Sequence, residues 1–206
     1  MIVPVGDPPS PAALTRAIEV LARGHPVALP TDTVYGLAAD PFRPGAVARI
    51  FEAKRRPRHV KLPVLVADTD QALALATDVP DAASILMDRF WPGALTVVLP
   101  ARAGLGADLG DDDATIGIRC PAHPVPLALC AAVGPLATTS ANRHGEPTLT
   151  TAAEVMAAFG DAVAVVLDGG TCAGSPSTVV DCTGVEPKLL RAGRVPWSEL
   201  LSVLES

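Results

Sequence analysis

The stretch PVALPTDTVYGL, residues 26–37, decides the fold because it pairs a buried strand with a polar loop. Its first half, 26–30, is a short apolar run bounded by prolines, which is typical of a buried strand. Its second half, 31–37, begins with hydroxyl and carboxylate side chains and contains a glycine, which predicts a loop after that strand. In an open α/β sheet, ligands bind outside the ends of strands, so this loop is a candidate binding segment.

A helix is predicted on each side of this stretch. Before it, Ser10 and Pro11 form an N-cap and a first turn, and apolar residues at helical spacing continue until Gly24. After it, Pro44 opens a second helix. Pro57 must end that helix, because proline disfavours the helical conformation in the residue before it.

The rest of the chain continues the alternation of strands and helices. We expect strands over 62–67, 95–99, 115–119, 136–139, 163–167, 178–181 and 188–190. We expect helices over 69–76, 81–90, 124–133, 151–159 and 196–204, and a surface loop rich in glycine and aspartate over 101–113. Such alternation predicts an α/β sheet with helices packed on it. A chain of 206 residues without a linker or a repeat is expected to form one domain, residues 1–206.

Composition argues against several classes of protein. The chain is 49% hydrophobic and 18% charged, which is typical of a protein with a large core rather than of a disordered one. No apolar run is long enough to cross a bilayer, and the N-terminus lacks the segments of a secretory signal, so we expect a cytoplasmic protein without membrane contact. The four cysteines and four histidines show no metal-site spacing, and we expect no metal ligands.

The positive charge is concentrated in one segment of an acidic chain. The formal net charge is −6, which disfavours a protein that coats nucleic acid by charge alone. Five of the sixteen basic residues nevertheless fall within KRRPRHVK, residues 54–61. Such a cluster is typical either of an anion site or of a solvated helix end, since basic side chains favour helix C-termini. The cluster alone leaves both interpretations open.

Hydroxyl, amide and cationic side chains recur at the ends of predicted strands and of the second helix. They are Thr31, Thr33, Lys54, Arg56, Arg119, Thr138, Thr139, Ser140, Asn142, Ser177, Thr178 and Arg191. Together these groups suit phosphate and carboxylate ligands, although each one alone is also common in turns. The sequence contains neither a P-loop nor a G-x-S-x-G elbow, so a nucleotide would be held in another way and no serine-hydrolase motif is present.

Six sequence blocks occur in an order that resembles a known family. They are PTDTVYGL (30–37), KRRP (54–57), RFWPGALT (89–96), T-x-x-x-R (115–119), TSAN (139–142) and PSTVVD (176–181). The chain is similar, over about residues 12–195, to the YrdC/Sua5 family of L-threonylcarbamoyladenylate synthases. The resemblance implies a YrdC-like single domain, in which helices flank a twisted mixed sheet with a concave basic cavity. We expect the short form of the family, without the C-terminal Sua5 domain.

The resemblance also implies a reaction. The amine of L-threonine takes up bicarbonate or CO2 to give a carbamate, whose oxygen attacks the α-phosphorus of ATP while pyrophosphate leaves. This nucleotidyl transfer is the first step of t6A37 biosynthesis in tRNA, and Mg2+ is expected to accompany ATP. It needs no protein nucleophile, so the enzyme would act by positioning and by neutralising charge. Partners are expected to be L-threonine, ATP and bicarbonate, with tRNA and downstream t6A transfer proteins as further candidates.

Residue roles follow from the same resemblance. Threonine would be bound by Thr33, Arg119, Thr138 and Ser177. Lys54 and Arg56 would be the catalytic pair and would face the phosphates of ATP. The nucleotide site would also contain Thr115, Ser140, Asn142, Thr148 and Arg191. Tyr35 would either pack over the substrate or belong to the core.

Two positions depart from the family pattern. Val60 stands where many members have lysine or asparagine, and Lys61 follows it, which leaves the role of Lys61 open. Ala192 replaces the proline of an L-R-P-G sequence, so Arg191 is kept on a less rigid turn.

Two other functions stay open. The first is an RNA-binding module without turnover, which the basic cluster favours but which the acidic balance and the 3% aromatic content disfavour. The second is a carbamoyl-transfer enzyme, because hydrogenase maturation proteins contain a related domain.

Overall fold

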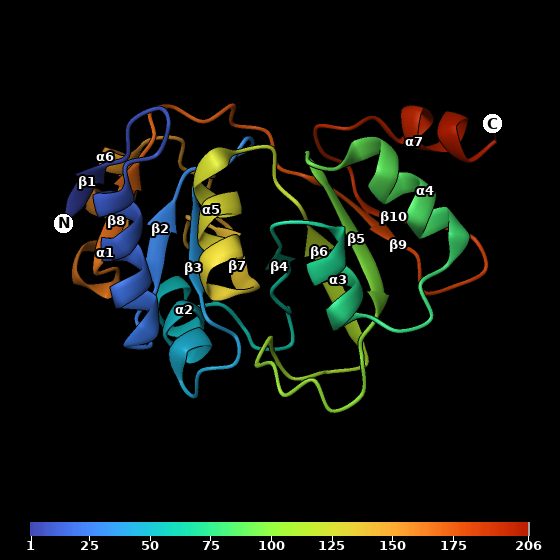
Figure 1. Cartoon of the computed structure of the whole chain (residues 1–206), viewed down its shortest axis with the longest axis horizontal. Coiled ribbons are helices and arrows are strands. Elements are labelled where there is room, and N and C mark those ends of the chain that lie inside the picture. Colours follow the sequence, from blue (N-terminus) through green and yellow to red (C-terminus); the bar gives the residue numbers. More distant parts are fainter. Residues whose placement is uncertain (206) are drawn as a thin grey trace.

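The computed structural model describes residues 1–205, and within these residues ten strands form one mixed sheet (Figure 1). In spatial order the strands are β1 (Ile2–Pro4), β8 (Val165–Asp168), β2 (Val27–Leu29), β3 (Gly36–Ala39), β7 (Leu136–Ser140), β4 (Val64–Leu65), β6 (Thr115–Arg119), β5 (Leu95–Pro100), β9 (Thr178–Asp181) and β10 (Lys188–Arg191). Four neighbouring pairs are parallel, β1–β8, β8–β2, β4–β6 and β5–β9, and the others are antiparallel. The predicted α/β class and mixed sheet are confirmed.

Seven α-helices of the described chain flank this sheet. They are α1 (Pro11–Ala22), α2 (Ala46–Lys54), α3 (Thr69–Leu75), α4 (Asp81–Phe90), α5 (Pro124–Val133), α6 (Ala152–Phe159) and α7 (Trp197–Leu204), and a short 3-10 turn, Gly160–Ala162, follows α6. Each lies where a helix is predicted. In α1, for example, the Ser10 hydroxyl caps the first turn by accepting from the Ala13 amide at 3.2 Å. Figure 1 shows α1, α2 and α5 over one half of the sheet and α3, α4 and α7 over the other.

Two strands of the sheet escape prediction. One is β1, and the other is β3, whose first two residues fall within the predicted loop 31–37. The loop prediction is therefore wrong at its end: Gly36 pairs with Leu29, and β2 and β3 form an antiparallel hairpin. The sequence GLAA is buried throughout, so it shows no alternation of apolar and polar residues, and it contains no β-branched residue that would signal a strand.

The end of α2 also differs from expectation. The helix stops at Lys54, three residues before Pro57, because Arg55 adopts a left-handed conformation with φ of 51°. The amide of Arg56 then donates to the Phe51 carbonyl at 2.9 Å and closes the turn. As a result the Lys54 side chain points into the protein, while Arg56 leaves the helix in another direction.

The two halves of the sheet meet at a narrow junction. There β7 and β4 pair through two residue pairs, Val64 with Ala137 and Leu65 with Leu136. On one half, α1 and α5 enclose a core cluster against β2 and β8. On the other, alternate residues of β5 and β6 point to the core beneath α3 and α4, including Val97. The remaining residues of β5 and β6 face the opposite side of the sheet.

Across residues 1–205, no helix combines the length and apolarity that a membrane span requires.

Candidate functional site

A cavity of about 250 Å3 lies at the junction of the two halves of the sheet. Its walls are Thr31, Thr33, Val34, Gly36, Arg56, Pro63, Leu65, Thr96, Arg119, Thr138, Thr139, Ser140, Thr148, Pro176, Ser177 and Arg191. This main cavity contains every predicted site residue except Lys54, Thr115 and Asn142. Hydroxyls and three arginines dominate its polar lining, and no carboxylate occurs among the described lining residues, so the cavity suits anions.

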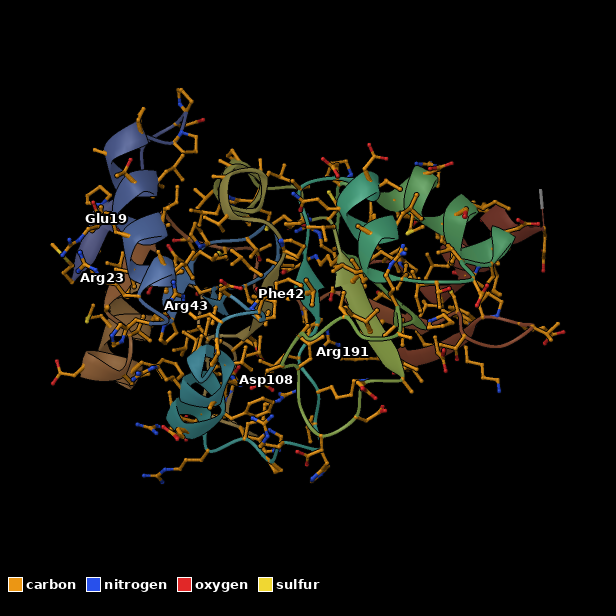
Figure 2. All side chains as sticks on the ribbon, turned by 60° about the horizontal axis from the view of Figure 1, so that its bottom comes forward. Glu19, Arg23, Phe42, Arg43, Asp108 and Arg191 are labelled. Atoms are coloured by element: carbon orange, nitrogen blue, oxygen red, sulfur yellow. The ribbon has the colours of Figure 1, made fainter. Side chains whose placement is uncertain are left out.

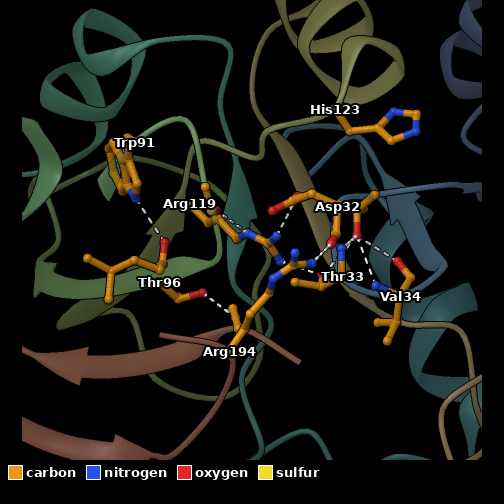
Figure 3. A network of polar contacts seen from close by, with 12 residues as sticks. Asp32, Thr33, Val34, Trp91, Thr96, Arg119, His123 and Arg194 are labelled. Carbon is orange, nitrogen blue, oxygen red and sulfur yellow. Dashed lines mark hydrogen bonds and ion pairs between the residues drawn. The ribbon is translucent and has the colours of Figure 1, made fainter. Parts of the chain in front are cut away.

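Arg119 lines the main cavity, and three acceptors hold its side chain. It ends β6, and its side chain is 8% exposed. Its Nε donates to the Gly93 carbonyl at 2.9 Å, Nη1 to the Thr33 hydroxyl at 2.9 Å and Nη2 to Asp32 Oδ1 at 2.6 Å (Figure 3). Burial lowers the pKa of Arg119, whereas Asp32 acts in the opposite direction. The guanidinium is thus rigid and paired with one carboxylate.

The β2–β3 hairpin presents Thr33 to this arginine. The Thr31 hydroxyl donates to the Val34 carbonyl at 2.6 Å and accepts from the amides of Thr33 and Val34 at 3.1 and 3.2 Å. The hydroxyls of Thr31 and Thr33 lie 2.9 Å apart. Arg194 braces the same hairpin, since its Nη1 donates to the Asp32 carbonyl at 2.8 Å. The hydroxyls that the sequence places after the strand therefore build the turn as well as line the cavity.

Ser177 and Arg191 form a second group on the cavity wall. The hydroxyls of Ser177 and Thr96 lie 2.8 Å apart and are buried. Arg191 donates from Nη2 to the Ser177 carbonyl at 2.8 Å and to its hydroxyl at 3.0 Å. Figure 2 shows Arg191 near the middle of the molecule, away from its outer ends. Arg191 therefore joins the end of β10 to the start of β9 beside the cavity.

Arg56 is a further cation of the main cavity. Its Nε donates to the Val60 carbonyl at 2.7 Å and its Nη2 to the Lys61 carbonyl at 2.9 Å, which orders the segment after α2. Burial lowers the pKa of Arg56, and the charge of Arg191 lowers it further. Two like charges held close together repel each other, so an anion bound between them would relieve that repulsion.

Lys54 and Asn142, by contrast, lie behind the cavity wall. Lys54 is 1% exposed, and its Nζ donates to the carbonyls of Ser140 and Asn142. The Asn142 amide group donates to the Arg143 and Glu146 carbonyls, and its Oδ1 accepts from the Ser140 hydroxyl at 2.5 Å. Burial lowers the pKa of Lys54 to about 7, and Arg56 acts in the same direction. In this structure both residues shape the turn that presents Ser140, and phosphate contact by either one stays a prediction.

The basic segment 54–61 divides among different environments. Arg58 pairs with Asp108 at 2.6 Å and with Asp111 at 3.3 Å. Lys61 pairs with Asp112 at 3.0 Å and donates to the Thr115 hydroxyl at 3.0 Å. The acidic loop that follows β5 therefore neutralises part of the cluster, while Arg56 alone of the segment reaches the main cavity.

A second cavity of about 290 Å3 adjoins the first and shares Arg56, Pro63, Thr96 and Arg191 with it. Thr115, the third predicted residue missing from the main cavity, lines this adjoining cavity together with Lys61. The predicted nucleotide residues thus extend from one cavity into the other.

Sequence reasoning missed some contributors to the site. Asp32 and Thr96 lie within the quoted sequence blocks. No sequence pattern predicts that Asp32 pairs with Arg119 or that Thr96 contacts Ser177. Tyr35 belongs to the core: it is fully buried, its hydroxyl donates to the Gly170 carbonyl at 2.8 Å, and burial raises its pKa to about 12.

The fold and the cavity together define an α/β protein with a cavity suited to small anionic ligands where the two halves of its sheet meet. The profile of the Sua5/YciO/YrdC family, described as "Telomere recombination", matches residues 19–193, and the chain belongs to this family.

Named relatives agree with this assignment. The chain is 41% identical over 192 residues to a Mycobacterium tuberculosis (strain H37Rv) protein, covering 93% of this chain and 88% of that one. It is 40% identical over 186 residues to the threonylcarbamoyl-AMP synthase of Pyrococcus abyssi, covering 89% of this chain and 55% of the relative. The crystal structure of P. abyssi Sua5 complexed with L-threonine matches with a TM-score of 0.90 and 37% identity, over 99% of this chain and 61% of that chain. The chain thus spans a little over half the length of the P. abyssi protein.

Proposed function

We propose that the chain makes threonylcarbamoyl-AMP and pyrophosphate from L-threonine, bicarbonate or CO2, and ATP, and is therefore a nucleotidyltransferase. Relatives named threonylcarbamoyl-AMP synthase support the reaction, and a relative solved with L-threonine supports the substrate. The observation that carries the proposal is the lining of the main cavity, which combines the rigid guanidinium of Arg119, two mutually repelling arginines and many hydroxyls.

Arg119 suits the carboxylate of threonine. Its contacts to Gly93, Thr33 and Asp32 leave a further N–H on each Nη atom, and such a fork pairs with a carboxylate through two parallel hydrogen bonds. The hydroxyls of Thr33, Thr138 and Ser177 line the same cavity and would surround the rest of the amino acid.

Arg56 and Arg191 suit the phosphate chain of ATP. In the proposed step the carbamate oxygen forms a bond to the α-phosphorus, and the bond from that phosphorus to the pyrophosphate oxygen breaks. Both guanidiniums would neutralise the charge that gathers on the phosphate oxygens. Thr148 also lines the cavity and would donate a hydroxyl hydrogen bond to a phosphate oxygen. Ser140 lines it too, but its hydroxyl hydrogen is donated to Asn142 Oδ1. Holding the reactants together supplies the rest of the catalysis, and no side chain need act as a nucleophile.

Mg2+ is proposed to enter with ATP. The described lining side chains offer hydroxyls but no carboxylate, so this set fits an ion held largely by phosphate oxygens and water, as Mg2+ commonly is. When bound, the ion would neutralise phosphate charge. Participation in t6A37 biosynthesis, contact with tRNA and downstream transfer proteins, and a cytoplasmic location belong to the same proposal.

Pyrophosphate release tests this function directly. Purified protein is incubated with Mg-ATP, and L-threonine and bicarbonate are omitted in turn. We expect release only when both are present, together with a product of the mass of threonylcarbamoyl-AMP. Release without threonine would refute the proposed acceptor, and no release from a folded, ATP-binding protein would refute the reaction.

A matched pair of variants ties the activity to the cavity. Arg56→Ala removes a cavity arginine, whereas Arg55→Ala removes an exposed arginine next to it. We expect Arg56→Ala to lower kcat/KM by roughly 100-fold, since one oriented donor to developing charge contributes about 3 kcal/mol. Arg55→Ala should retain the wild-type rate. Equal rates in the two variants would remove Arg56 from the mechanism.

A further inference from the structure

The three arginines of the main cavity differ in the charge of their partners. Arg119 pairs with the carboxylate of Asp32 at 2.6 Å. Arg56 and Arg191 instead donate to carbonyl and hydroxyl oxygens, and no carboxylate of the described chain forms an ion pair with either. Arg119 together with its partner is therefore neutral, whereas Arg56 and Arg191 carry two uncompensated positive charges.

The carboxylate of Asp32 lies on the far side of Arg119 from the main cavity. Its side chain is 14% exposed and lines a separate hollow of about 510 Å3, which shares no lining residue with the main cavity. Figure 3 shows the side chains of Asp32 and Arg119 directed toward each other. A ligand in the main cavity would therefore meet the guanidinium of Arg119 and would be affected by Asp32 through its charge.

The cations of the site are close enough to influence one another. Burial lowers the pKa of Arg119 most, the charges of Arg191 and Arg194 lower it further, and Asp32 raises it. Arg191 also lowers the pKa of Arg56. Without the carboxylate of Asp32, the positive potential would extend across all the arginines of the cavity, and a phosphate group would be attracted to Arg119 as well.

We propose that Asp32 determines which anion each arginine of the main cavity accepts: it neutralises Arg119, so that this arginine binds the carboxylate of the amino acid and discriminates against phosphate. This assignment rests on the proposed function and deepens it. A phosphate group carries more negative charge than a carboxylate and loses more attraction when its site is neutralised. An amino acid is a zwitterion without net charge, and the fork of N–H donors that suits its carboxylate remains. Phosphates are thereby directed to Arg56 and Arg191.

Asp32→Asn tests this role because it removes the charge and keeps the hydrogen bonds. The asparagine oxygen can still accept from Arg119, and the backbone carbonyl that binds Arg194 is unchanged. Calorimetry measures the Kd for L-threonine with and without inorganic phosphate. In wild type, phosphate should leave this Kd unchanged. In Asp32→Asn we expect phosphate to compete with threonine, with an affinity for the Arg119 site raised at least about tenfold.

Asp108→Asn is the matched control. Asp108 pairs with Arg58 at the same distance of 2.6 Å, but neither residue lines the main cavity. This variant should behave as wild type. Three results would overturn the role of Asp32: competition by phosphate in wild type, no competition in Asp32→Asn, or weaker threonine binding in Asp32→Asn without competition. The last result would mean that Asp32 only orients Arg119.

A second measurement needs neither threonine nor turnover. Phosphate is titrated into Asp32→Asn and into the double variant Asp32→Asn, Arg119→Gln. The affinity gained in the single variant should disappear in the double variant, because Arg119 is the proposed site of the gain. Its persistence would overturn the assignment. A wild-type protein that bound no threonine or released no pyrophosphate would refute the proposed function, while this titration would still decide the role of Asp32.

Discussion

Arg119 shows how much one side chain depends on its neighbours. Three acceptors orient its guanidinium, and one of them is a carboxylate at 2.6 Å. Arg119→Lys keeps the charge but loses the planar fork that suits a carboxylate. We expect the KM for threonine to rise about 10- to 100-fold, the range that a charged hydrogen bond contributes. Steady-state kinetics with saturating ATP measures this change.

The KM for ATP provides the control for that substitution. The phosphates of ATP are proposed to bind to Arg56 and Arg191 rather than to Arg119, so the KM for ATP should stay near the wild-type value in Arg119→Lys. A selective rise in the KM for ATP would instead place the nucleotide beside Arg119 and reverse the proposed orientation of the substrates.

Lys54 supplies a prediction about pH. Its pKa is about 7 in the folded protein against an ordinary value of 10.5. Between these values the unfolded chain binds more protons, so folding stability rises with pH. From pH 7.5 to 9 the wild type should gain about 2 kcal/mol relative to Lys54→Met, which lacks the titrating group. Urea unfolding of both proteins across this range measures the difference.

Parallel pH profiles for wild type and Lys54→Met would show that the Lys54 pKa is not lowered. The same variant bears on the role of Lys54. Its ammonium is occupied by the carbonyls of Ser140 and Asn142, so its removal should destabilise the protein as well as slow the reaction. An exposed phosphate ligand would affect the reaction alone.

At the scale of elements, local patterns predicted those strands and helices that have caps, alternation or β-branched residues. The helix that begins after Ser10 and the strand 115–119 are examples, and both are confirmed. β3 could not be predicted, because GLAA has neither alternation nor β-branched residues and only its pairing with β2 and β7 makes it a strand. The end of α2 depends on the left-handed backbone conformation of Arg55, which no local sequence pattern predicts.

The segment after β10 depends on a glycine at its closest approach to β9. A Cβ on Gly193 would lie 2.4 Å from the backbone of Ser177 and Thr178, so Gly193→Ala must push these segments apart. Arg191 and Arg194 flank this glycine and both contact the cavity wall or its hairpin. We expect kcat/KM to fall at least about tenfold, the loss of one charged hydrogen bond.

A second glycine substitution controls for the loss of glycine itself. Gly184 lies in the turn between β9 and β10, and a Cβ there would approach no atom closer than 3.9 Å. Gly184→Ala should therefore retain wild-type kinetics. If Gly193→Ala were equally active, the segment after β10 would not set the geometry of the site.

At the scale of the whole molecule, the sequence predicts that polar residues lie at strand ends, but it does not predict which of these strand ends lie close together. Thr33, Arg119 and Ser177 are far apart in the chain, and strand order brings them together at the junction of the two halves. The sequence also does not show which residues face the cavity and which ones lie behind its wall and support it. Lys54 and Asn142 belong to the same motifs as Arg56 and Ser140, and only the direction of each side chain separates them.

The narrow pairing of β7 with β4 has a mechanical consequence. The two-residue strand β4 pairs through two residue pairs with β7 and through two with β6, so we expect bending of the sheet to concentrate around β4. The main cavity lies over this part of the sheet, with Thr33 and Ser140 on one half and Thr96 and Arg119 on the other. A ligand that contacts both sides would act as a brace and stiffen the sheet. Binding of a ligand in the cavity would then make the whole protein more rigid.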